Sequence, residues 1–252
     1  MNKTKVFEEL LNQFETEEIR KYCEDMIQLI PDYIFQIPSS TSMKYHNKTQ
    51  CQTHGQLYHI VMFGTIMNYI LGLKYIREHK VTTPKQRDCL RCTPIFHDAI
   101  KCGFEADVNS YSVFEHPLLA GEWIRESIVE HDIEQELKEY IASLCESHSG
   151  EWTTSKKSLK VLPEPVSDDA FIVHLSDYLS SRANLDMIYS LEFLELLGDY
   201  SPELPDVNTY QLTFGKYSGK TLPEINAFDP GYIDWLKENI GREPIRSLLS
   251  QI

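Results

Sequence analysis

The sequence predicts a mainly α-helical protein in which a helical bundle is followed by a small α+β module. Up to residue 197, apolar residues recur at helical spacing and strand signals are nearly absent. The next segment, GDYSPELPDVN, has the Pro, Asp and Asn content of a linker, and TYQLTF beyond it alternates like a strand. We therefore expect a helical domain over residues 1–197, a linker over 198–208 and a small module over 209–252.

The first helices are predicted between residues 3 and 30, where apolar positions recur in two short pieces. A long helix is predicted from Gly55 to about Arg77, because its apolar residues share one face. Such a face requires a partner to pack against, so this helix is expected at the centre of the bundle.

Thr83 and Pro84 have the character of a cap and a first helical residue. The helix that they open is predicted to run toward Lys101 with a kink at Pro94. Apolar periodicity predicts further helices over residues 114–129, 131–147, 168–184 and 185–197.

In the module, TLPEINAFDPGYIDWLKENIG predicts two short helices after a glycine-containing turn. The turn, GKYSGKT, is one residue short of a phosphate-binding P-loop, and Pro223 interrupts the helix that a P-loop requires. A strand followed by a glycine turn is therefore the favoured interpretation.

Composition limits the classes of protein. The chain has 252 residues, of which 42% are hydrophobic and 25% are charged, as in soluble globular proteins. No apolar run reaches the roughly 18 to 20 residues of a membrane helix, and the N-terminus has no apolar signal core. We expect a cytoplasmic protein without a membrane partner, and a homo-oligomer is compatible with the sequence.

Charge and cysteines exclude two kinds of site. The formal charge of −14 argues against a broad basic surface for duplex DNA, although a local cationic groove is compatible with it. Cys89 and Cys92 form a lone CxxC whose second pair is absent, which argues against a structural zinc site.

Histidines and acids mark the candidate site. His59 lies four residues before Phe63 on the apolar face of the long helix, where a lone histidine is most often a hydrogen-bonded core residue. His97 and Asp98 are adjacent behind an apolar run, and burying such a pair is costly unless something binds it. Adjacent helical residues project about 100° apart, so the pair can reach different sides of one ion, or Asp98 can bridge two.

Further candidate ligands occur on separate predicted helices: His116, His148 and Asp177. Imidazoles and carboxylates without a thiolate suit one or two ions of Mn, Fe, Co, Ni or Zn in an open, catalytic site. His131 and Asp132 repeat the dipeptide in an acidic, polar stretch, and we expect them outside the site.

These pieces resemble a known family. The succession of His59, His97-Asp98, His116, His148 and Asp177 is similar to the H...HD...H...H...D pattern of the HD-domain metal-dependent phosphohydrolase superfamily, over roughly residues 40 to 185. SMKYHNKTQCQTHGQLYH resembles S-x-K-Y-H followed by G-G-L-x-x-H, HDAIK resembles HDxxK, and HLSDYL resembles H-x-x-D. Among subfamilies the chain is most similar to the bacterial HD-type 3′-to-5′ exoribonucleases, from which it departs at Ser149, where they have a second histidine.

The resemblance implies a ligand set and a mechanism. It implies a first ion held by His59, His97, Asp98 and Asp177, and a second held by Asp98, His116 and His148. A metal lowers the pKa of bound water to roughly 7, which provides a hydroxide for attack on phosphorus. Asp98 and Lys101 are then the catalytic residues, and Lys101 neutralises charge on the phosphoryl oxygens. Lys44, His46 and His54 are expected on the substrate side, and core packing is the alternative for the two histidines.

The tail LTFGKYSGKTLPEINAFDPGYIDWLKENI resembles the small C-terminal module of exonuclease X-type nucleases. The resemblance implies a contact with nucleic acid in which Lys216 and Lys220 bind phosphates. Tyr217 and Trp235 would stack on bases, and a place in the core is the alternative for Trp235.

Together the two resemblances imply a metal-dependent phosphodiesterase that shortens single-stranded nucleic acid from the 3′ end. One alternative is a phosphohydrolase of (d)NTPs, nucleoside monophosphates or cyclic nucleotides, which the acidic total charge favours because a small ligand needs only a local pocket. A non-catalytic sensor of metal and nucleotide, and a di-iron oxygenase with an HD-like fold, are the remaining alternatives.

Overall fold

The computed structural model describes residues 2–40, 44–108, 110–197, 206–212, 214–239 and 245–252. The chain divides into two compact units, Met1–Met187 and Ile188–Ile252. This division lies earlier in the chain than the end of the helical domain expected at residue 197. The last helix that we expected in that domain, α10 (Leu191–Leu196), therefore belongs to the second unit.

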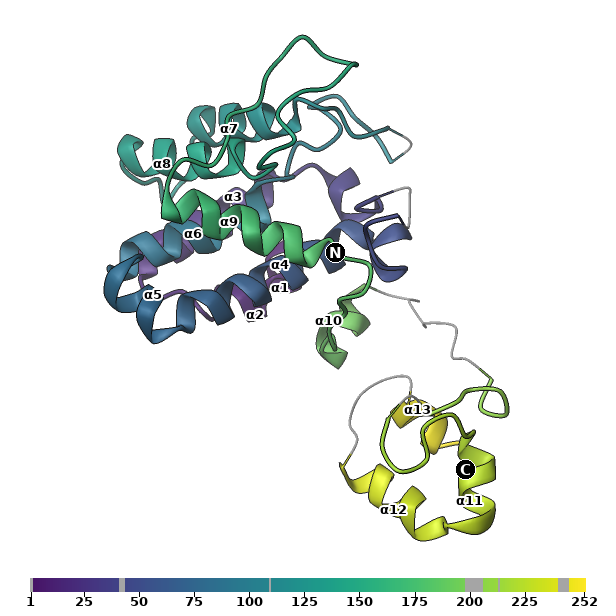
Figure 1. Cartoon of the computed structure of the whole chain (residues 1–252). Helices are drawn as coiled ribbons and strands as arrows, with labels where there is room; N and C mark the ends of the chain where they lie inside the picture. Colours follow the sequence, from purple (N-terminus) through teal and green to yellow (C-terminus); the bar gives the residue numbers. More distant parts are fainter. Residues whose placement is uncertain (1, 41–43, 109, 198–205, 213, 240–244) are drawn as a thin grey trace. The chain divides into compact units, whose positions relative to one another are not determined.

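The first unit is a bundle of helices, as predicted (Figure 1). In it α7 packs along α8, and α4 packs against both α9 and α6. Segments far apart in the sequence thus enclose a common interior. The helices of this unit are α1 (Lys3–Val6), α2 (Glu8–Leu11), α3 (Glu17–Leu29), α4 (Gly55–Gly72), α5 (Lys74–His79), α6 (Pro84–Phe96), α7 (His116–Glu126), α8 (Gln135–Glu146) and α9 (Asp168–Ser180), with 3-10 turns η1 (Asp32–Phe35) and η2 (Thr49–Cys51).

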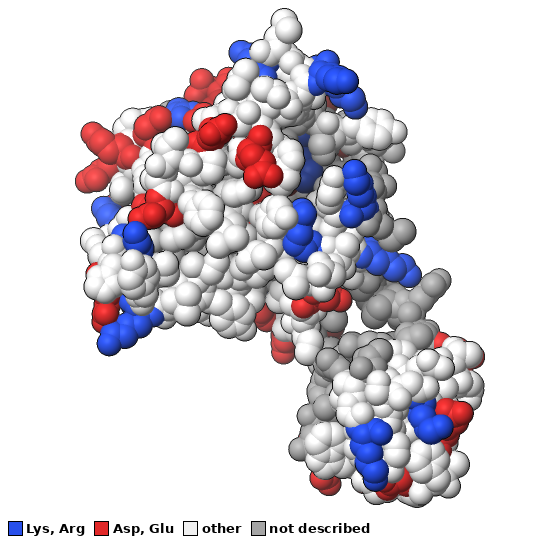
Figure 2. All heavy atoms as spheres, viewed as in Figure 1, with Lys and Arg blue, Asp and Glu red and all other residues white. Residues whose placement is uncertain are grey.

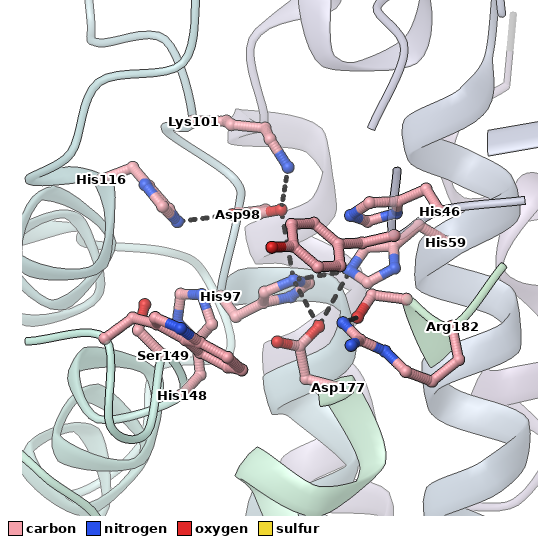
Figure 3. Close-up of a pocket in the computed structure, with 13 residues that line it drawn as sticks. His46, His59, His97, Asp98, Lys101, His116, His148, Ser149, Asp177 and Arg182 are labelled. Carbon is pink, nitrogen blue, oxygen red and sulfur yellow. Dashed lines mark hydrogen bonds and ion pairs between the residues drawn. The ribbon is translucent and has the colours of Figure 1, made fainter. Parts of the chain in front are cut away.

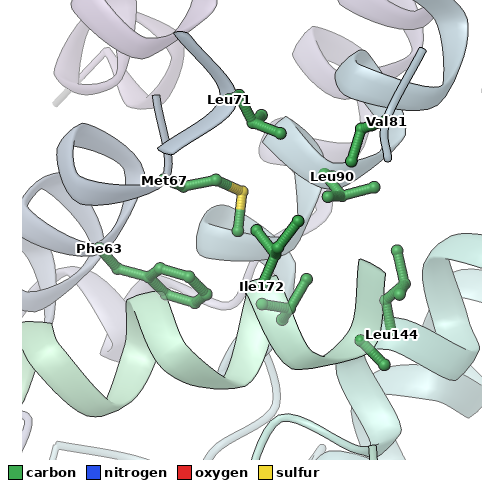
Figure 4. Packing of buried hydrophobic residues seen from close by; sticks show 9 residues of the cluster. Phe63, Met67, Leu71, Val81, Leu90, Leu144 and Ile172 are labelled. Carbon is green, nitrogen blue, oxygen red and sulfur yellow. The ribbon is translucent and has the colours of Figure 1, made fainter. Parts of the chain in front are cut away.

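An apolar cluster joins α4, α6, α8 and α9 (Figure 4). Phe63 and Met67 of α4 meet Leu90 of α6, Leu144 of α8 and Val173 of α9, and all five side chains are almost completely buried. Burying one such side chain contributes about 1.5 to 3 kcal/mol, so this cluster holds the helices that carry the candidate ligands. His59 lies one helical turn before Phe63 and is positioned by the same packing.

Two helices differ from the prediction. The long helix is interrupted at Leu73, whose backbone is extended, so α4 and α5 are separate. The helix that Thr83 and Pro84 open has the expected cap, in which the Thr83 side chain accepts a hydrogen bond from the backbone N–H of Gln86. It ends at Phe96 instead of running to Lys101, and turns follow it.

Proline explains how the last turn of α6 is completed. Pro94 has no N–H to give to the carbonyl of Leu90, four residues earlier. The Thr93 hydroxyl donates to that carbonyl instead, at 2.7 Å. The helix therefore persists past the proline and ends where His97 begins the turn.

The second unit contains α10, α11 (Leu222–Phe228), α12 (Pro230–Asn239) and α13 (Ile245–Leu249). The strand expected at TYQLTF is reduced, in the part of this segment that the structure describes, to one antiparallel bridge between Gln211 and Thr221. Gly215 and Gly219, with φ of 71° and 85°, form the turn between them. The interior of this unit is an apolar cluster of Leu212, Leu222, Ile225, Ile233, Leu236, Ile245, Leu248 and Leu249.

Of the helices described, none combines the length and the apolar character that crossing a membrane requires.

Candidate metal centre

Six side chains that the sequence singled out meet in one pocket of the first unit (Figure 3). The pocket has a volume of about 390 Å³, which is within the range of small-ligand sites. His59 comes from α4, His97 and Asp98 from the end of α6 and the turn after it, His116 from the start of α7, His148 from the end of α8, and Asp177 from α9.

Hydrogen bonds turn the imidazole lone pairs into this pocket. In His97, His116 and His148, Nδ1 lies 2.9, 2.7 and 2.7 Å from the backbone carbonyl three residues earlier. A carbonyl oxygen can only accept, so each Nδ1 carries a proton, and in the neutral imidazole Nε2 is the nitrogen with the lone pair. The orientation of these rings is thus set by local backbone, and the free nitrogens face the pocket.

His59 has the same tautomer for a different reason. Its Nδ1 lies 3.2 Å from Oγ of Ser180. That hydroxyl donates to the carbonyl of Asp177 at 2.7 Å and therefore accepts from His59. Nε2 of His59 consequently also presents a lone pair.

The inward atoms are close enough to share a cation. Nε2 of His59 is 3.2 Å from Nε2 of His97 and 3.0 Å from Oδ1 of Asp177. Two lone pairs and an anionic oxygen at these separations repel one another unless a proton or a metal ion lies among them. A metal ion could supply this positive charge, and partners on the far ring nitrogen are typical of metal-binding histidines.

The donor atoms form two overlapping groups. Those of His59, His97 and Asp177 lie within 4.8 Å of one another, and so do those of His97, Asp98 and His148. His116 adjoins the second group, with Nε2 3.0 Å from Oδ1 of Asp98. His97 is common to both groups, and the sharing of Asp98 between two ions stays a prediction.

Burial and charge set the protonation states of these ligands. Burial lowers the pKa of His148 to about 3 and also lowers the pKa of His59. Burial acts in the same direction on His97, but the adjacent Asp98 carboxylate outweighs it and raises the pKa of that imidazole. Neutral imidazoles at His59 and His148 are in the form that binds metals.

The two carboxylates are ionised in spite of their burial. Burial by itself raises the pKa of Asp98, yet Lys101 and His97 hold it well below its usual value. For Asp177 the interaction with the adjacent His59 imidazole outweighs burial in the same way and lowers the pKa. Both acids are therefore available as anionic ligands at neutral pH.

Lys101 contacts one of these acids. Its Nζ lies 2.5 Å from Oδ2 of Asp98 and 3.0 Å from Oε1 of Gln56. Nε2 of Gln56 donates to the same Asp98 oxygen at 3.0 Å, which closes a ring of three buried side chains. Gln56 was not predicted to be a site residue, because its only signal in the sequence is a polar side chain three residues before His59 in an apolar helix.

Of the three residues expected on the substrate side, only His46 lines the pocket. Its Nδ1 lies 2.7 Å from Oε1 of Gln50, and burial lowers its pKa to about 4. Lys44 and His54 are not among the pocket-lining residues. Nδ1 of His54 donates instead to the carbonyl of Phe35 at 2.5 Å.

Four residues that the sequence analysis overlooked complete the pocket: Tyr45, Trp152, Ser181 and Arg182. Ser149, at the departure from the exoribonuclease pattern, also lines it. The signal for Trp152 was a large aromatic side chain in a segment without helical periodicity.

The candidate nucleic-acid residues of the second unit lie on its surface. Lys216 is exposed, with Nζ 3.3 Å from Oδ2 of Asp229, and Lys220 is exposed as well. Trp235 is 46% exposed and stacks on Tyr232, with ring centroids 5.5 Å apart. This tryptophan is therefore accessible from solvent.

Charge is unevenly distributed over the visible face of the first unit (Figure 2). Acidic side chains gather toward the left of that view and basic ones toward the right. A total charge of −14 is therefore compatible with a local basic region.

Two family models match this chain. The HD domain matches residues 57–182, a range that includes all six candidate ligands. The exodeoxyribonuclease X-like C-terminal model matches residues 212–240. Neither the curated proteins nor the solved structures include a match.

Proposed function

The chain belongs to the HD-domain family of metal-dependent phosphohydrolases, and from this premise we propose that it is a 3′-to-5′ exonuclease acting on single-stranded nucleic acid. The observation that carries the proposal is the convergence of imidazole lone pairs and ionised carboxylates in one pocket. The matching C-terminal module supports a polymeric substrate.

The donor set fits one or two divalent ions of the Mn, Fe, Co, Ni or Zn type. His59, His97 and Asp177 would hold one ion, and His97, Asp98 and His148, with His116 beside them, are the ligands for a second. When bound, such an ion supplies an activated water and neutralises charge on the phosphoryl oxygens.

The protein's own side chains then orient the substrate. Lys101 provides an ammonium group at the Asp98 side of the pocket, where it can bind a phosphoryl oxygen. Gln56 holds both Asp98 and Lys101 through its amide and acts as a positioning residue. A scissile phosphate in the pocket would therefore have a cation on more than one side.

A phosphohydrolase of small nucleotides is the second candidate. A cavity of about 390 Å³ is the size of a small-ligand site, and the charge of −14 disfavours polyanions in general. This candidate uses the same ligands and differs only in the substrate.

A substrate panel separates the two candidates. The protein is incubated with Mn²⁺ and a 5′-labelled oligoribonucleotide, a 5′-labelled oligodeoxyribonucleotide, or single nucleotides. A ladder that shortens from the 3′ end supports the exonuclease, and phosphate or pyrophosphate released from mononucleotides alone supports the second candidate. Nucleotide binding without turnover, with any metal, would support a sensor and contradict both.

Asp98→Ala is the matched loss-of-function variant. We expect it to abolish turnover of every substrate in the panel while circular dichroism shows a retained helical fold. Asp132→Ala is the control, because Asp132 is the aspartate of the second His-Asp dipeptide and pairs with Lys138 outside the pocket. Residual activity of Asp98→Ala comparable to the control would contradict the role of Asp98.

A further inference from the structure

Aromatic side chains and one arginine surround the metal pocket, and we call Tyr45, Trp152, Tyr178 and Arg182 the aromatic rim. Tyr45, Trp152 and Arg182 line the same pocket as the candidate ligands. Trp152 lies parallel to Tyr178, with ring centroids 5.9 Å apart and planes 6° from parallel. Since Trp152 remains 51% exposed, it has indole surface available for another planar group.

A hydrogen bond to the backbone of His148 links the rim to the candidate metal centre. Nδ1 of His174 donates to the carbonyl of His148 at 2.8 Å, which attaches the turn before Trp152 to α9. Gly150 has a φ of +62°, and a Cβ added there would lie 2.1 Å from the His174 ring, so the turn packs directly on it. The same contacts therefore position both the candidate ligand His148 and the exposed indole of Trp152.

Arg182 is held by aromatic faces. Its guanidinium carbon lies 4.0 Å from the ring centroid of Tyr178 and 5.4 Å from that of Tyr45. Over the described part of the chain it forms no ion pair with a carboxylate, and its Nε has no hydrogen-bond partner. Arg87, Arg91 and Arg125, in contrast, each bind acids.

An arginine in this state is suited to an anion. Stacking orients the planar guanidinium, and its donors are not used by a protein carboxylate. One Nη donates to the Ser181 hydroxyl at 2.7 Å, which leaves further N–H groups for phosphate oxygens. The rim thus combines a stacking surface with a phosphate-binding group beside the metal ligands.

We propose that the aromatic rim binds the nucleotide whose 5′-phosphate is attacked, with its base stacked on Trp152 and a phosphate oxygen bound by Arg182. The proposal rests on the phosphohydrolase function proposed above. It adds that the site selects substrates with a base. Every base has a planar π face, so such a rim prefers nucleotides over phosphate esters without a base, and does so with little sequence preference.

The kinetic test compares two oligonucleotides that differ only in whether the 3′-terminal residue has a base. Trp152→Ala should lower kcat/KM on the complete oligonucleotide by about ten-fold or more, since stacking contributes on that scale. On the abasic oligonucleotide, wild type and Trp152→Ala should have the same low kcat/KM, because this substrate has no terminal base to stack on Trp152. Trp152→Phe, which keeps a ring, should stay near wild type.

Tyr69→Ala is the control for removing an exposed aromatic side chain, because Tyr69 is 75% exposed on α4 and does not line the pocket. It should leave both substrates unaffected. Equal turnover of the abasic and complete oligonucleotides by wild type, or an equal loss on both in Trp152→Ala, would overturn the proposal.

Binding is measured separately by fluorescence. The full chain with Mn²⁺ is mixed with AMP or with ribose 5-phosphate, and tryptophan emission is read immediately after mixing. AMP should quench the emission, ribose 5-phosphate should not, and Trp152→Phe should remove the quench. Arg182→Ala should weaken AMP binding about ten-fold, as expected for losing a hydrogen bond to a charged group, and Arg182→Lys should restore part of it.

The two proposals fail differently. If wild type cleaves no oligonucleotide or nucleotide with any metal, the proposed function fails, and the AMP quench still decides whether the rim binds a base. If wild type cleaves its substrate but AMP does not quench Trp152, the rim proposal fails and the proposed function stands.

Discussion

At the scale of single residues, the tautomers of the histidines decide what the pocket can bind. His97, His116 and His148 each direct Nε2 inward because a carbonyl three residues earlier accepts from Nδ1. The sequence identified these histidines as candidates, but the hydrogen bonds depend on how each helix starts or ends. The carbonyls of Pro94 and Cys145 lie in the last turns of α6 and α8, where carbonyls lack helical partners, whereas the carbonyl of Val113 lies in the turn before α7.

His97 should be the most sensitive ligand, because it belongs to both groups of donor atoms. We expect His97→Gln to weaken Mn²⁺ binding by more than the roughly 10- to 100-fold that losing an outer partner of a metal ligand costs. Equilibrium dialysis followed by elemental analysis measures this directly, without reference to turnover.

The control is His131→Gln, in the repeated dipeptide. His131 is half-exposed and pairs with Asp25, 3.0 Å away, so its loss should not change the metal content. If His97→Gln retains as much Mn²⁺ as His131→Gln, the pocket is not a metal centre.

At the scale of elements, an ionic network joins α6 to the start of α3. Glu15 accepts hydrogen bonds from Arg87 at 2.7 and 2.6 Å and from Arg91 at 2.9 Å. Asp88 accepts from the backbone N–H groups of Glu15 and Thr16, the residues just before α3. Because His97 and Asp98 directly follow α6, this network also helps to position these two candidate ligands.

Glu15→Gln should destabilise the protein by about 2 kcal/mol, since it leaves the buried Arg87 without its carboxylate partner. Urea denaturation followed by circular dichroism gives the free energy of unfolding. Glu24→Gln is the control, because its partner Arg20 lies on the surface and such pairs contribute about 0.3 to 0.5 kcal/mol. Similar losses in the two variants would contradict the structural role of Glu15.

The same network predicts a pH dependence. Hydrogen bonds from Arg87 outweigh burial and lower the pKa of Glu15 from 4.5 to about 2. A carboxyl with a lowered pKa in the folded state stabilises the protein above its unfolded pKa, and this contribution is lost as the pH falls. The stability difference between wild type and Glu15→Gln should therefore be constant above about pH 5 and shrink between about pH 4.5 and 2.

At the scale of the whole molecule, two units with different chemistry share one chain. The first contains the candidate metal centre, and the second contains exposed lysines and the half-exposed Trp235. Residues 201–252 hold five Lys and Arg and seven Asp and Glu, so any attraction for nucleic acid must come from local groups rather than net charge.

Removing residues 205–252 should weaken turnover of oligonucleotides far more than turnover of mononucleotides, because a mononucleotide has no further phosphates for the module's lysines to bind. The substitution of both Lys216 and Lys220 by alanine should do the same in the full chain and reduce the salt dependence of oligonucleotide binding. Lys237→Ala, an exposed lysine of α12, is the control. Equal losses on both substrate types would remove the nucleic-acid role of the module.

Local signals in the sequence were sufficient for much of the fold. The Thr83 cap and the positions of α7, α8 and α9 follow from neighbouring residues, because capping and helical periodicity act within a few positions. The interruption at Leu73 and the reduction of the expected strand to one bridge were not predicted.

The sequence by itself determined that the first domain is helical and that particular imidazoles and acids are candidates for a metal, since both follow from residue type and spacing. Only the tertiary structure decided that His97 belongs to both groups of donor atoms, that His54 binds backbone instead of lining the pocket, and that Trp152 and Arg182 surround it. The physical reason is that distances between residues far apart in the chain are set by the packing of the apolar core.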